Sequence, residues 1–185
     1  MTNDLILVID MQNVYLPGEA WGCLNMPKAT QNIKKLLDQT ENDICFTQFI
    51  ADEKAEGVWK EYNVVNKEIN EDKWLNEIVD ELKPYVEEYP IYTKSTYSSM
   101  KIKEIQKKMA RKDRLVITGV VSECCVLATC LEAIDMGYKI IYLEDACAGF
   151  NEETEEAVKT IFSGLIPLHV EIMTTDSYLT QEKNK

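Results

Sequence analysis

The sequence has few of the residues that usually build metal and nucleotide sites. It contains a single histidine, His169, in 185 residues. Its six cysteines form neither a Cys-x-x-Cys pair nor another metal-ligand spacing. The seven glycines are scattered, so neither Gly-x-Gly-x-x-Gly nor a phosphate-binding Gly-Lys-Thr segment occurs. These absences predict a protein without a resident metal or nucleotide cofactor.

Cations and long apolar runs are also scarce. Lys and Arg total 20 against 32 Asp and Glu, which gives a formal net charge of −12. This balance argues against a nucleic acid or an anionic membrane as partner, because phosphate binding needs clustered cations. No apolar run approaches the roughly 18–20 residues of a spanning helix, and residues 1–4 form no basic leader. We expect a cytoplasmic protein that acts on a small molecule and keeps its cysteines reduced.

Short apolar runs alternate along the chain with amphipathic ones. Continuous apolar runs are typical of buried parallel strands, and strands separated by helices predict a parallel sheet covered on both faces. We predict an α/β fold, a three-layer doubly wound sandwich in a single domain over residues 1–185. Its six parallel strands are expected at residues 5–9, 44–49, 91–93, 115–117, 139–143 and 170–173.

The helices are predicted from apolar residues at helical spacing and from end signals. One is expected over residues 71–83, with Pro84 ending it. Asn151 is the expected N-cap of another, which stops at Gly164. The remaining helices are marked by three apolar sets: Ile33, Leu36 and Leu37; Ile102, Ile105 and Met109; and Leu127, Leu131 and Ile134, with Gly137 as a stop.

Three polar side chains of different chemistry follow the predicted strands. Asp10 follows the first strand, Lys94 follows the third, and Cys125 lies in the segment after the fourth. Each alone is typical of a turn, a solvated surface or core filler. However, ligands bind such folds at the carboxyl ends of the strands. The three residues therefore predict a crevice that holds a carboxylate, an amine and a thiol.

This combination suits nucleophilic catalysis. A thiol is a weak nucleophile at its free pKa of about 8.5, and a helix N-terminus and the Lys94 ammonium both favour the thiolate of Cys125. Asp10 can accept the thiol proton and return it to a leaving group. Ser122 precedes Cys125 by three residues, which predicts it as the helix N-cap.

Four stretches of the chain resemble the isochorismatase-like cysteine hydrolases, a superfamily that includes the nicotinamidases. Their order and spacing follow that family along nearly the whole chain, and the third stretch is the most specific. The four stretches are residues 7–13, 92–98, 117–129 and 143–148. The resemblance implies a sheet of six parallel strands, in agreement with the count from the apolar runs.

The resemblance implies a catalytic triad of Asp10, Lys94 and Cys125. It selects Cys125 over Cys124, because the family's nucleophile directly precedes a Val-x-x-Thr segment. A vicinal pair of thiols is otherwise ambiguous from sequence alone.

The resemblance also implies a backbone arrangement and an assembly. A cis peptide is implied between Val120 and Val121, with the backbone N–H groups of Val121 and Cys125 forming an oxyanion hole. Members of the family are commonly homo-oligomers, so a dimer or tetramer is implied.

The chain departs from the nicotinamidases where those relatives bind a metal. They carry an Asp and several His residues after the second strand, whereas this chain has Thr-Gln-Phe-Ile-Ala-Asp over residues 47–52. Nicotinamidase activity is therefore disfavoured. Family members that cleave an enol ether can lack the nucleophilic cysteine, so Cys125 favours amide chemistry. The predicted function is cleavage of a C–N bond in a small amide, ureido or imide substrate through a thioester.

Several aromatic residues follow the predicted strands and are candidates for the pocket. Tyr15 and Tyr97 follow the first and second motifs and are predicted to contact substrate. Substrate specificity is expected in loops 14–26 and 48–70. Packing in the core is an equally good interpretation of any single aromatic residue. Four further rings lie beyond the strands and can form a lid: Trp21, Phe49, Trp59 and Tyr62.

Three other interpretations stay open at this point. A relative without activity could serve as a binding or scaffold subunit, but the intact Asp10, Lys94 and Cys125 argue against it. A receiver-like signalling domain would need a phosphorylatable Asp where Lys94 stands. Redox sensing through Cys124 and Cys125 would require a strained vicinal disulfide. Faster alkylation of Cys125 than of the other five thiols would indicate an activated nucleophile.

Overall fold

The computed structural model describes residues 3–184; the remaining residues of the predicted span 1–185 lie outside the described part. Six strands form one sheet in the order β3-β2-β1-β4-β5-β6, and neighbouring strands pair in parallel. This confirms the predicted six-stranded parallel sheet. The strands are β1 (Asp4–Ile9), β2 (Asp43–Phe49), β3 (Ile91–Lys94), β4 (Arg114–Val120), β5 (Lys139–Ala148) and β6 (Val170–Met173).

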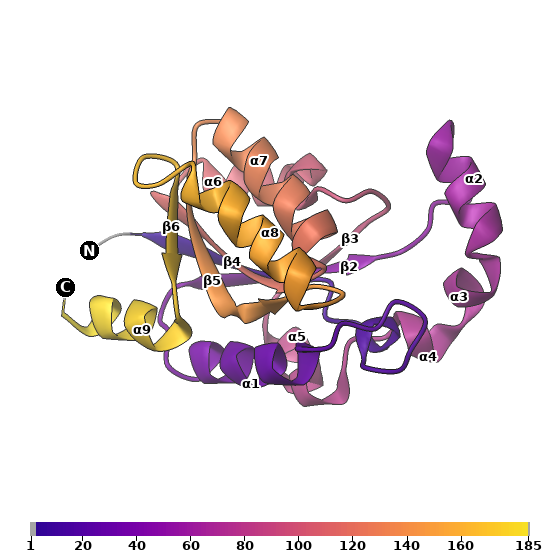
Figure 1. Cartoon of the computed structure of the whole chain (residues 1–185), viewed down its shortest axis with the longest axis horizontal. Coiled ribbons are helices and arrows are strands. Elements are labelled where there is room, and N and C mark those ends of the chain that lie inside the picture. Colours follow the sequence, from indigo (N-terminus) through magenta and orange to yellow (C-terminus); the bar gives the residue numbers. More distant parts are fainter. Residues whose placement is uncertain (1–2, 185) are drawn as a thin grey trace.

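Helices cover both faces of the sheet, which confirms the predicted three-layer arrangement (Figure 1). One face packs against α1 (Met26–Leu37), α5 (Lys83–Glu88) and α9 (Thr175–Lys183), and the other against α6 (Lys103–Met109), α7 (Leu127–Asp135) and α8 (Glu152–Ser163). Successive side chains of a strand point to opposite faces. In β1, Leu5, Leu7 and Ile9 therefore join the core under α6–α8, while Ile6 and Val8 join the core over α1 and α9.

The strand order reverses direction at β1, which has β2 on one side and β4 on the other. All six residues of β1 are buried, and Leu5–Ile9 is the continuous apolar run that a strand between two helical layers requires. At its carboxyl end Gly119 of β4 pairs with Ile9, and a Cβ added to Gly119 would lie only 2.1 Å from the Ile9 carbonyl oxygen. The two strand ends thus approach closely at the switch point of the sheet.

The predicted end signals of two helices are present. The Asn151 side chain accepts a hydrogen bond of 2.9 Å from the Thr154 N–H, and Thr154 returns its side chain to the Asn151 backbone. This is a capping box, and it confirms Asn151 as the N-cap of α8. After α7, Gly137 adopts a φ of 91°, a left-handed conformation that glycine tolerates best.

The helix predicted over residues 71–83 is wrong as a continuous element. After α4 the chain adopts an extended conformation, because Ile78 forms an antiparallel bridge with Gln12. Leu82 is still buried, so the apolar pattern is satisfied by separate turns. Pro84 lies in the first turn of α5 and ends no helix. The elements here are α3 (Lys67–Glu71), α4 (Lys73–Asn76), the 3-10 turn η2 (Asp80–Leu82) and α5.

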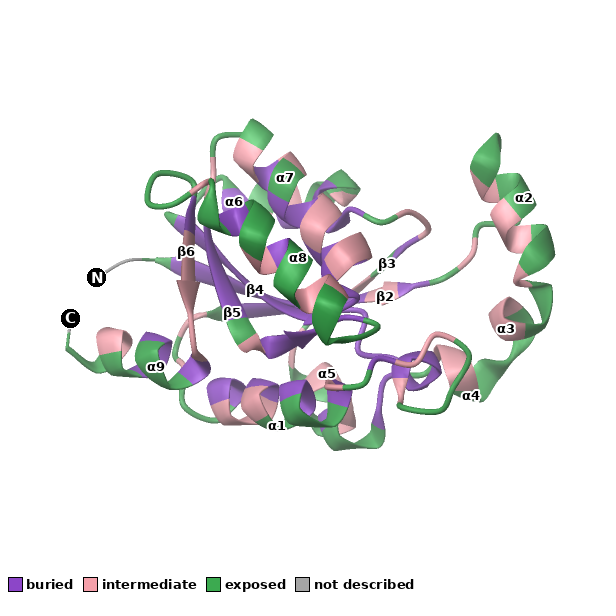
Figure 2. Cartoon of the chain, viewed as in Figure 1, coloured by how far each residue is buried: buried purple, intermediate pink, exposed green. Residues whose placement is uncertain are grey.

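A helical arm extends from the body of the molecule after β2. It begins with α2 (Val58–Val65), in a segment that the sequence indicated only as loop, and α2 contains no buried residue. Figure 2 shows the arm as exposed and intermediate, in contrast to the largely buried inner strands β1, β4 and β5. No helix within residues 3–184 has the length and apolar content needed to cross a membrane.

Candidate active site

The structure brings Asp10, Lys94 and Cys125 together at the carboxyl edge of the sheet. Asp10 follows β1, Lys94 is the last residue of β3, and Cys125 lies in the wide turn η4 (Ser122–Val126) after β4. The Lys94 Nζ lies 2.5 Å from Oδ2 of Asp10 and 3.2 Å from Sγ of Cys125. All three residues are buried. Three groups that are remote in sequence therefore share one site.

Lys94 reaches this site although β3 is two strands away from β1. Its backbone pairs with Phe49 at the end of β2, and its Nζ lies 5.6 Å from the centre of the Phe49 ring. The ammonium also donates to the Thr96 carbonyl oxygen at 3.1 Å. A long side chain with a mobile amine thus spans β2 and delivers one cation to the Asp10 carboxylate.

Asp10 is held by the neighbouring strand. Its N–H donates to the Thr47 carbonyl oxygen at 3.1 Å, and the Thr47 hydroxyl donates to Oδ1 of Asp10 at 2.8 Å. The φ of Asp10 is 51°, which Asp tolerates better than most residues. One carboxylate oxygen is therefore occupied by Thr47, and the other faces Lys94.

Cys125 sits in a turn that is wider than an α-helix. The Val121 carbonyl oxygen accepts from the N–H groups of both Cys124 and Val126, and within residues 3–184 no hydrogen bond joins it to the Cys125 N–H. Downstream, the Thr129 hydroxyl donates to the Cys125 carbonyl oxygen at 2.7 Å. Such wide turns are frequent at functional sites.

The predicted Ser122 cap is wrong. The wide turn begins at Ser122 itself, its N-cap is Val121, and no side chain caps it. The peptide bond between Val120 and Val121 is cis, as the resemblance implies. Val121 and Cys125 are both buried. Val121 is the N-cap of the same wide turn that contains Cys125. The oxyanion hole from their N–H groups stays a prediction.

Burial, not the local positive charge, dominates the protonation of Cys125. Burial raises the pKa of this thiol above its ordinary value, the negative charge of Asp10 raises it further, and Lys94 lowers it. The expectation of a favoured thiolate is therefore wrong before substrate binds, because desolvation and Asp10 outweigh Lys94. The site holds a neutral thiol beside a base.

Lys94 remains a cation in this setting. Burial lowers its pKa, but the Asp10 carboxylate and the hydrogen bonds to Asp10 and Cys125 raise it, and the net pKa is raised. The site therefore contains one buried ion pair and one neutral thiol, and it is electrically balanced.

Six aromatic rings form a continuous chain of contacts beside the thiol. The predicted pair Tyr15 and Tyr97 lie at its two ends. The pKa values of both hydroxyls are raised, first by burial and then by interaction with neighbours that include Cys125. The ring-centre distances are Tyr15–Trp21 5.8 Å, Trp21–Phe49 6.2 Å, Phe49–Trp59 6.2 Å and Trp59–Tyr97 4.9 Å, with Tyr62 5.3 Å from Trp59.

Gln12 is a residue of the site region that the sequence interpretation missed. Its side chain accepts from the Phe49 N–H at 2.8 Å and donates to the carbonyl oxygens of Phe49 and Asn76 at 3.0 and 2.9 Å. It thereby fixes the end of β2, from which the chain continues into the helical arm. Its position in the Asp-Met-Gln-Asn stretch could have indicated this role, because a side-chain amide that is buried after a strand needs hydrogen-bond partners.

The residues after β2 do not fit a metal centre of the nicotinamidase kind. This segment supplies Asp52 and no histidine, and residues 3–184 contain no group of three or more His, Cys, Asp or Glu side chains placed to hold an ion. Asp52 instead lines an open cavity of about 230 Å³ next to Lys94. The other lining residues are Ile50, Thr93 and Ser95.

The fold and this edge of the sheet define an α/β protein of the isochorismatase-like class. The family profile described as Isochorismatase domain matches residues 4–177, so the chain belongs to the isochorismatase family, whose members are hydrolases. The receiver-like interpretation is thereby wrong.

Relatives and solved structures match most of the chain. An uncharacterised isochorismatase family protein of Bacillus subtilis, YddQ, is 27% identical over 183 residues, which are 94% of this chain and 97% of that protein. Nicotinamidase 3 of Arabidopsis thaliana is 28% identical, over 82% of this chain and 76% of its own length. A cysteine hydrolase structure from Pseudomonas syringae superposes with a TM-score of 0.84 at 20% identity, covering 98% and 93% of the two chains. It shows the same fold.

Proposed function

We propose that the protein is a cysteine-dependent amidohydrolase that cleaves the C–N bond of a small amide, ureido or imide substrate. The observation that carries the proposal is the buried Lys94 ammonium, 2.5 Å from Asp10 and 3.2 Å from the Cys125 sulfur. A base, a cation and a nucleophile are the parts that covalent acyl transfer needs. Similarity to a nicotinamidase supports an amide as the substrate.

In the first step the neutral thiol loses its proton as it attacks. Asp10 takes the proton from Sγ of Cys125 while the S–C bond to the substrate carbonyl forms. The Lys94 ammonium stabilises the sulfur as it gains negative charge. The N–H groups of Val121 and Cys125 are the proposed donors to the tetrahedral oxyanion, and each such donor is typically worth about 3–4 kcal/mol of barrier in other hydrolases.

In the second step the same carboxyl group acts as acid and then as base. Protonated Asp10 gives its proton to the leaving nitrogen, the C–N bond breaks, and a thioester remains on Cys125. Asp10 then takes a proton from water as the water attacks the thioester. The S–C bond breaks, the acid product leaves, and the proton returns from Asp10 to the sulfur.

The test compares the two adjacent thiols. Cys125→Ala is expected to reduce ammonia release from an amide substrate by about 1,000-fold or more, because the nucleophile is lost. Cys124→Ala is the matched control and is expected to keep most of the activity. Rapid quenching of the wild type with mass spectrometry should place the acyl group on the peptide that contains residue 125. Near-normal activity of Cys125→Ala would reject the covalent mechanism.

A further inference from the structure

Thr129 carries a buried hydroxyl that joins two separate segments of the site. The residue lies in α7 and is 0% exposed. Its hydroxyl donates to the Cys125 carbonyl oxygen at 2.7 Å and accepts from the Ser99 N–H at 2.9 Å. A threonine hydroxyl has one donor and can also accept, so both capacities are used. One side chain thus connects the backbone of the nucleophile to a segment that precedes β4. The proposed mechanism gives Thr129, the last residue of the Val-x-x-Thr segment after Cys125, no role.

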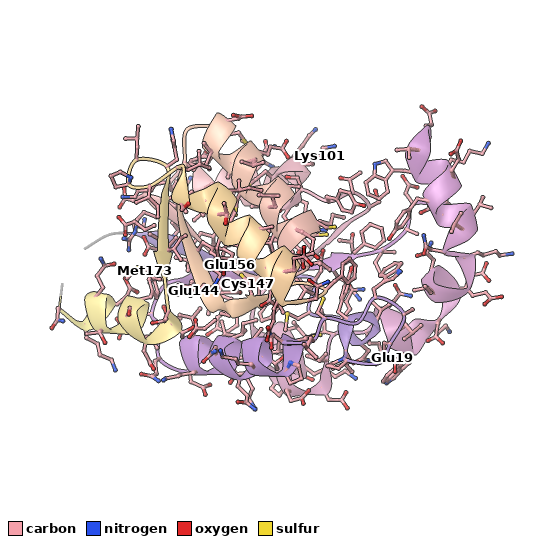
Figure 3. All side chains as sticks on the ribbon, in the orientation of Figure 1. Glu19, Lys101, Glu144, Cys147, Glu156 and Met173 are labelled. Carbon is pink, nitrogen blue, oxygen red and sulfur yellow. The ribbon has the colours of Figure 1, made fainter. Side chains whose placement is uncertain are left out.

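The segment on the far side of this connection carries the amine of the site. Ser99 begins the 3-10 turn η3 (Ser99–Lys101), which follows the loop after Lys94 and packs against α7. Figure 3 shows Lys101, the last residue of η3, near α7. The loop itself contains the Thr96 carbonyl oxygen, which accepts from the Lys94 Nζ at 3.1 Å. The position of this loop therefore sets the direction in which the Lys94 amine points.

The loop after Lys94 is attached at both of its ends. At its start, the Ile50 N–H donates to the Lys94 carbonyl oxygen at 2.8 Å, so the sheet fixes the backbone of the lysine. At its end, the buried Ser99 N–H is bound by the Thr129 hydroxyl. The Thr96 acceptor lies between these two attachments, and it is held in place only as far as both of them persist. Removing the Thr129 hydroxyl would release one end of the loop.

The nucleophile is held from two sides in a similar way. Upstream, the Val121 carbonyl oxygen accepts two backbone hydrogen bonds within the wide turn η4. Downstream, the Thr129 hydroxyl binds the Cys125 carbonyl oxygen, a bond to the residue four positions earlier that can bend the backbone of a helix. This bond acts where the wide turn passes into α7. In this arrangement the Lys94 Nζ lies 3.2 Å from the Cys125 sulfur.

We propose that Thr129 is a positioning residue of the active site. Its hydroxyl holds the Cys125 backbone and the loop after Lys94 in one fixed relation, and it thereby keeps the amine against the sulfur. Thr129 itself touches neither the amine nor the sulfur and acts through the two backbone groups that it binds. The effect on turnover rests on the proposed amide hydrolysis, whereas the effect on the reactivity of the thiol does not.

Two substitutions at position 129 separate the hydroxyl from the packing of the side chain. Thr129→Val keeps the shape and removes both hydrogen bonds. Its kcat is expected to fall about 10- to 100-fold while KM stays within about twofold, because misplaced reacting groups slow the chemical step. Thr129→Ser keeps the hydroxyl and should retain kcat within about threefold of the wild type. Ammonia release is measured with acetamide, benzamide and phenylurea. An unchanged kcat in Thr129→Val, or an equal loss in Thr129→Ser, would overturn the role of the hydroxyl.

Thr30 offers a matched control in α1, on the opposite face of the sheet from α7. It is buried, and its hydroxyl donates at 2.9 Å to the Met26 carbonyl oxygen, which also lies four residues earlier. Thr30→Val therefore removes the same kind of bond from a helix that does not carry the nucleophile. It should lower the urea midpoint and leave kcat unchanged. A loss of kcat as large as in Thr129→Val would show that general destabilisation explains both, and the inference would be wrong.

Alkylation of Cys125 by iodoacetamide gives a readout that does not need turnover. Thr129→Val is expected to slow alkylation about fivefold, because the ammonium that favours the thiolate is displaced. In Lys94→Met the amine is already absent, so adding Thr129→Val should change the rate by less than about twofold. The rates are measured by mass spectrometry of the peptide containing residue 125. The same factor in both backgrounds would mean that Thr129 controls access to the thiol and not its relation to Lys94, and it would overturn the inference, as would no change in either.

The two readouts keep the failure of the inference distinct from the failure of the proposed function. If the wild type releases no ammonia from any of the three probes, the proposed hydrolysis is rejected, and the alkylation rates in the two backgrounds still decide the role of Thr129. Thr129→Ala takes the place of Thr129→Val in both measurements if the valine variant does not fold, because alanine also lacks the hydroxyl and adds no bulk. The expected and the contradicting results are the same for both variants.

Discussion

The Lys94 ammonium lies 2.5 Å from the Asp10 carboxylate in a fully buried ion pair, and the same nitrogen donates to the Cys125 sulfur. The two charged residues act on the thiol in opposite directions. Asp10 raises the pKa of Cys125, in addition to the effect of burial, and Lys94 lowers it. The proposed mechanism nevertheless needs both residues. Thiol reactivity and turnover should therefore respond differently to their removal.

Asp10→Asn is expected to speed alkylation of Cys125 by iodoacetamide at pH 7 while it abolishes ammonia release. Removing the carboxylate charge lowers the pKa of the thiol and leaves the Lys94 ammonium to pair with the thiolate. Asn also tolerates the positive φ of this position. Lys94→Met is expected to slow alkylation and to abolish ammonia release as well. Both rates are followed by mass spectrometry of the peptide containing residue 125.

Cys125→Ala provides the background of the alkylation experiment, because the other five thiols remain. The proposal predicts opposite changes of the alkylation rate with the same loss of turnover. If both substitutions slowed alkylation equally, the electrostatic account of the thiol would be wrong.

The sheet was predictable because its signal is local. A strand buried between two helical layers must be apolar throughout, and Leu5–Ile9 is such a run. The position of the site followed from topology, since parallel strands bring their carboxyl ends to one edge. The predicted dimer or tetramer is not decided by a single chain and stays a prediction, which sedimentation equilibrium would test.

The failures arose where distant contacts override local pattern. The apolar residues of 71–83 sit at helical spacing, but a bridge between Ile78 and Gln12 extends the chain in their middle. The Ser122 cap failed because the turn after β4 is wider than an α-helix. The thiolate expectation counted the Lys94 charge and could not count desolvation, which depends on the complete fold.

Alkaline pH should destabilise the protein through its buried thiols. Burial raises the pKa of Cys45 from 9.0 to about 11. Because the pKa is higher in the folded than in the unfolded state, the Cys45 thiol makes its full contribution to the free energy of unfolding below pH 9. This contribution is lost as the pH rises through 11. Urea unfolding at a series of pH values should show the free energy of unfolding falling across this window. The fall should be shallower in Cys45→Ala than in the wild type; equal slopes would contradict the assignment to Cys45.

Gly119 should tolerate no larger residue. A Cβ there would lie 2.1 Å from the Ile9 carbonyl oxygen, and the φ of 110° is unfavourable for other residues. Gly119→Ala is expected to lower the free energy of unfolding by more than about 3 kcal/mol, or to prevent folding. Gly137→Ala is the matched control, because its φ is also positive but nothing lies within 4 Å of the added Cβ. Its expected cost is about 1 kcal/mol, and equal losses in urea would show that φ alone sets the effect.

Asp4 joins β1 to the C-terminal helix through a buried cluster. The Arg114 guanidinium donates to both carboxylate oxygens of Asp4 at 2.9 and 2.6 Å, and the Tyr178 hydroxyl donates to Oδ2 at 2.8 Å. Arg114→Ala would leave a buried carboxylate without its counter-ion, so a loss of about 3–5 kcal/mol in urea unfolding is expected. Tyr178→Phe removes the hydrogen bond to Asp4 and also the one that the hydroxyl accepts from the Asn42 side chain at 3.1 Å, and it should cost about 2 kcal/mol. The cluster lies at the opposite end of β1 from Asp10. Ammonia release per folded molecule should therefore be unchanged in both variants. A loss of turnover would show that the cluster also supports the active-site edge of the sheet.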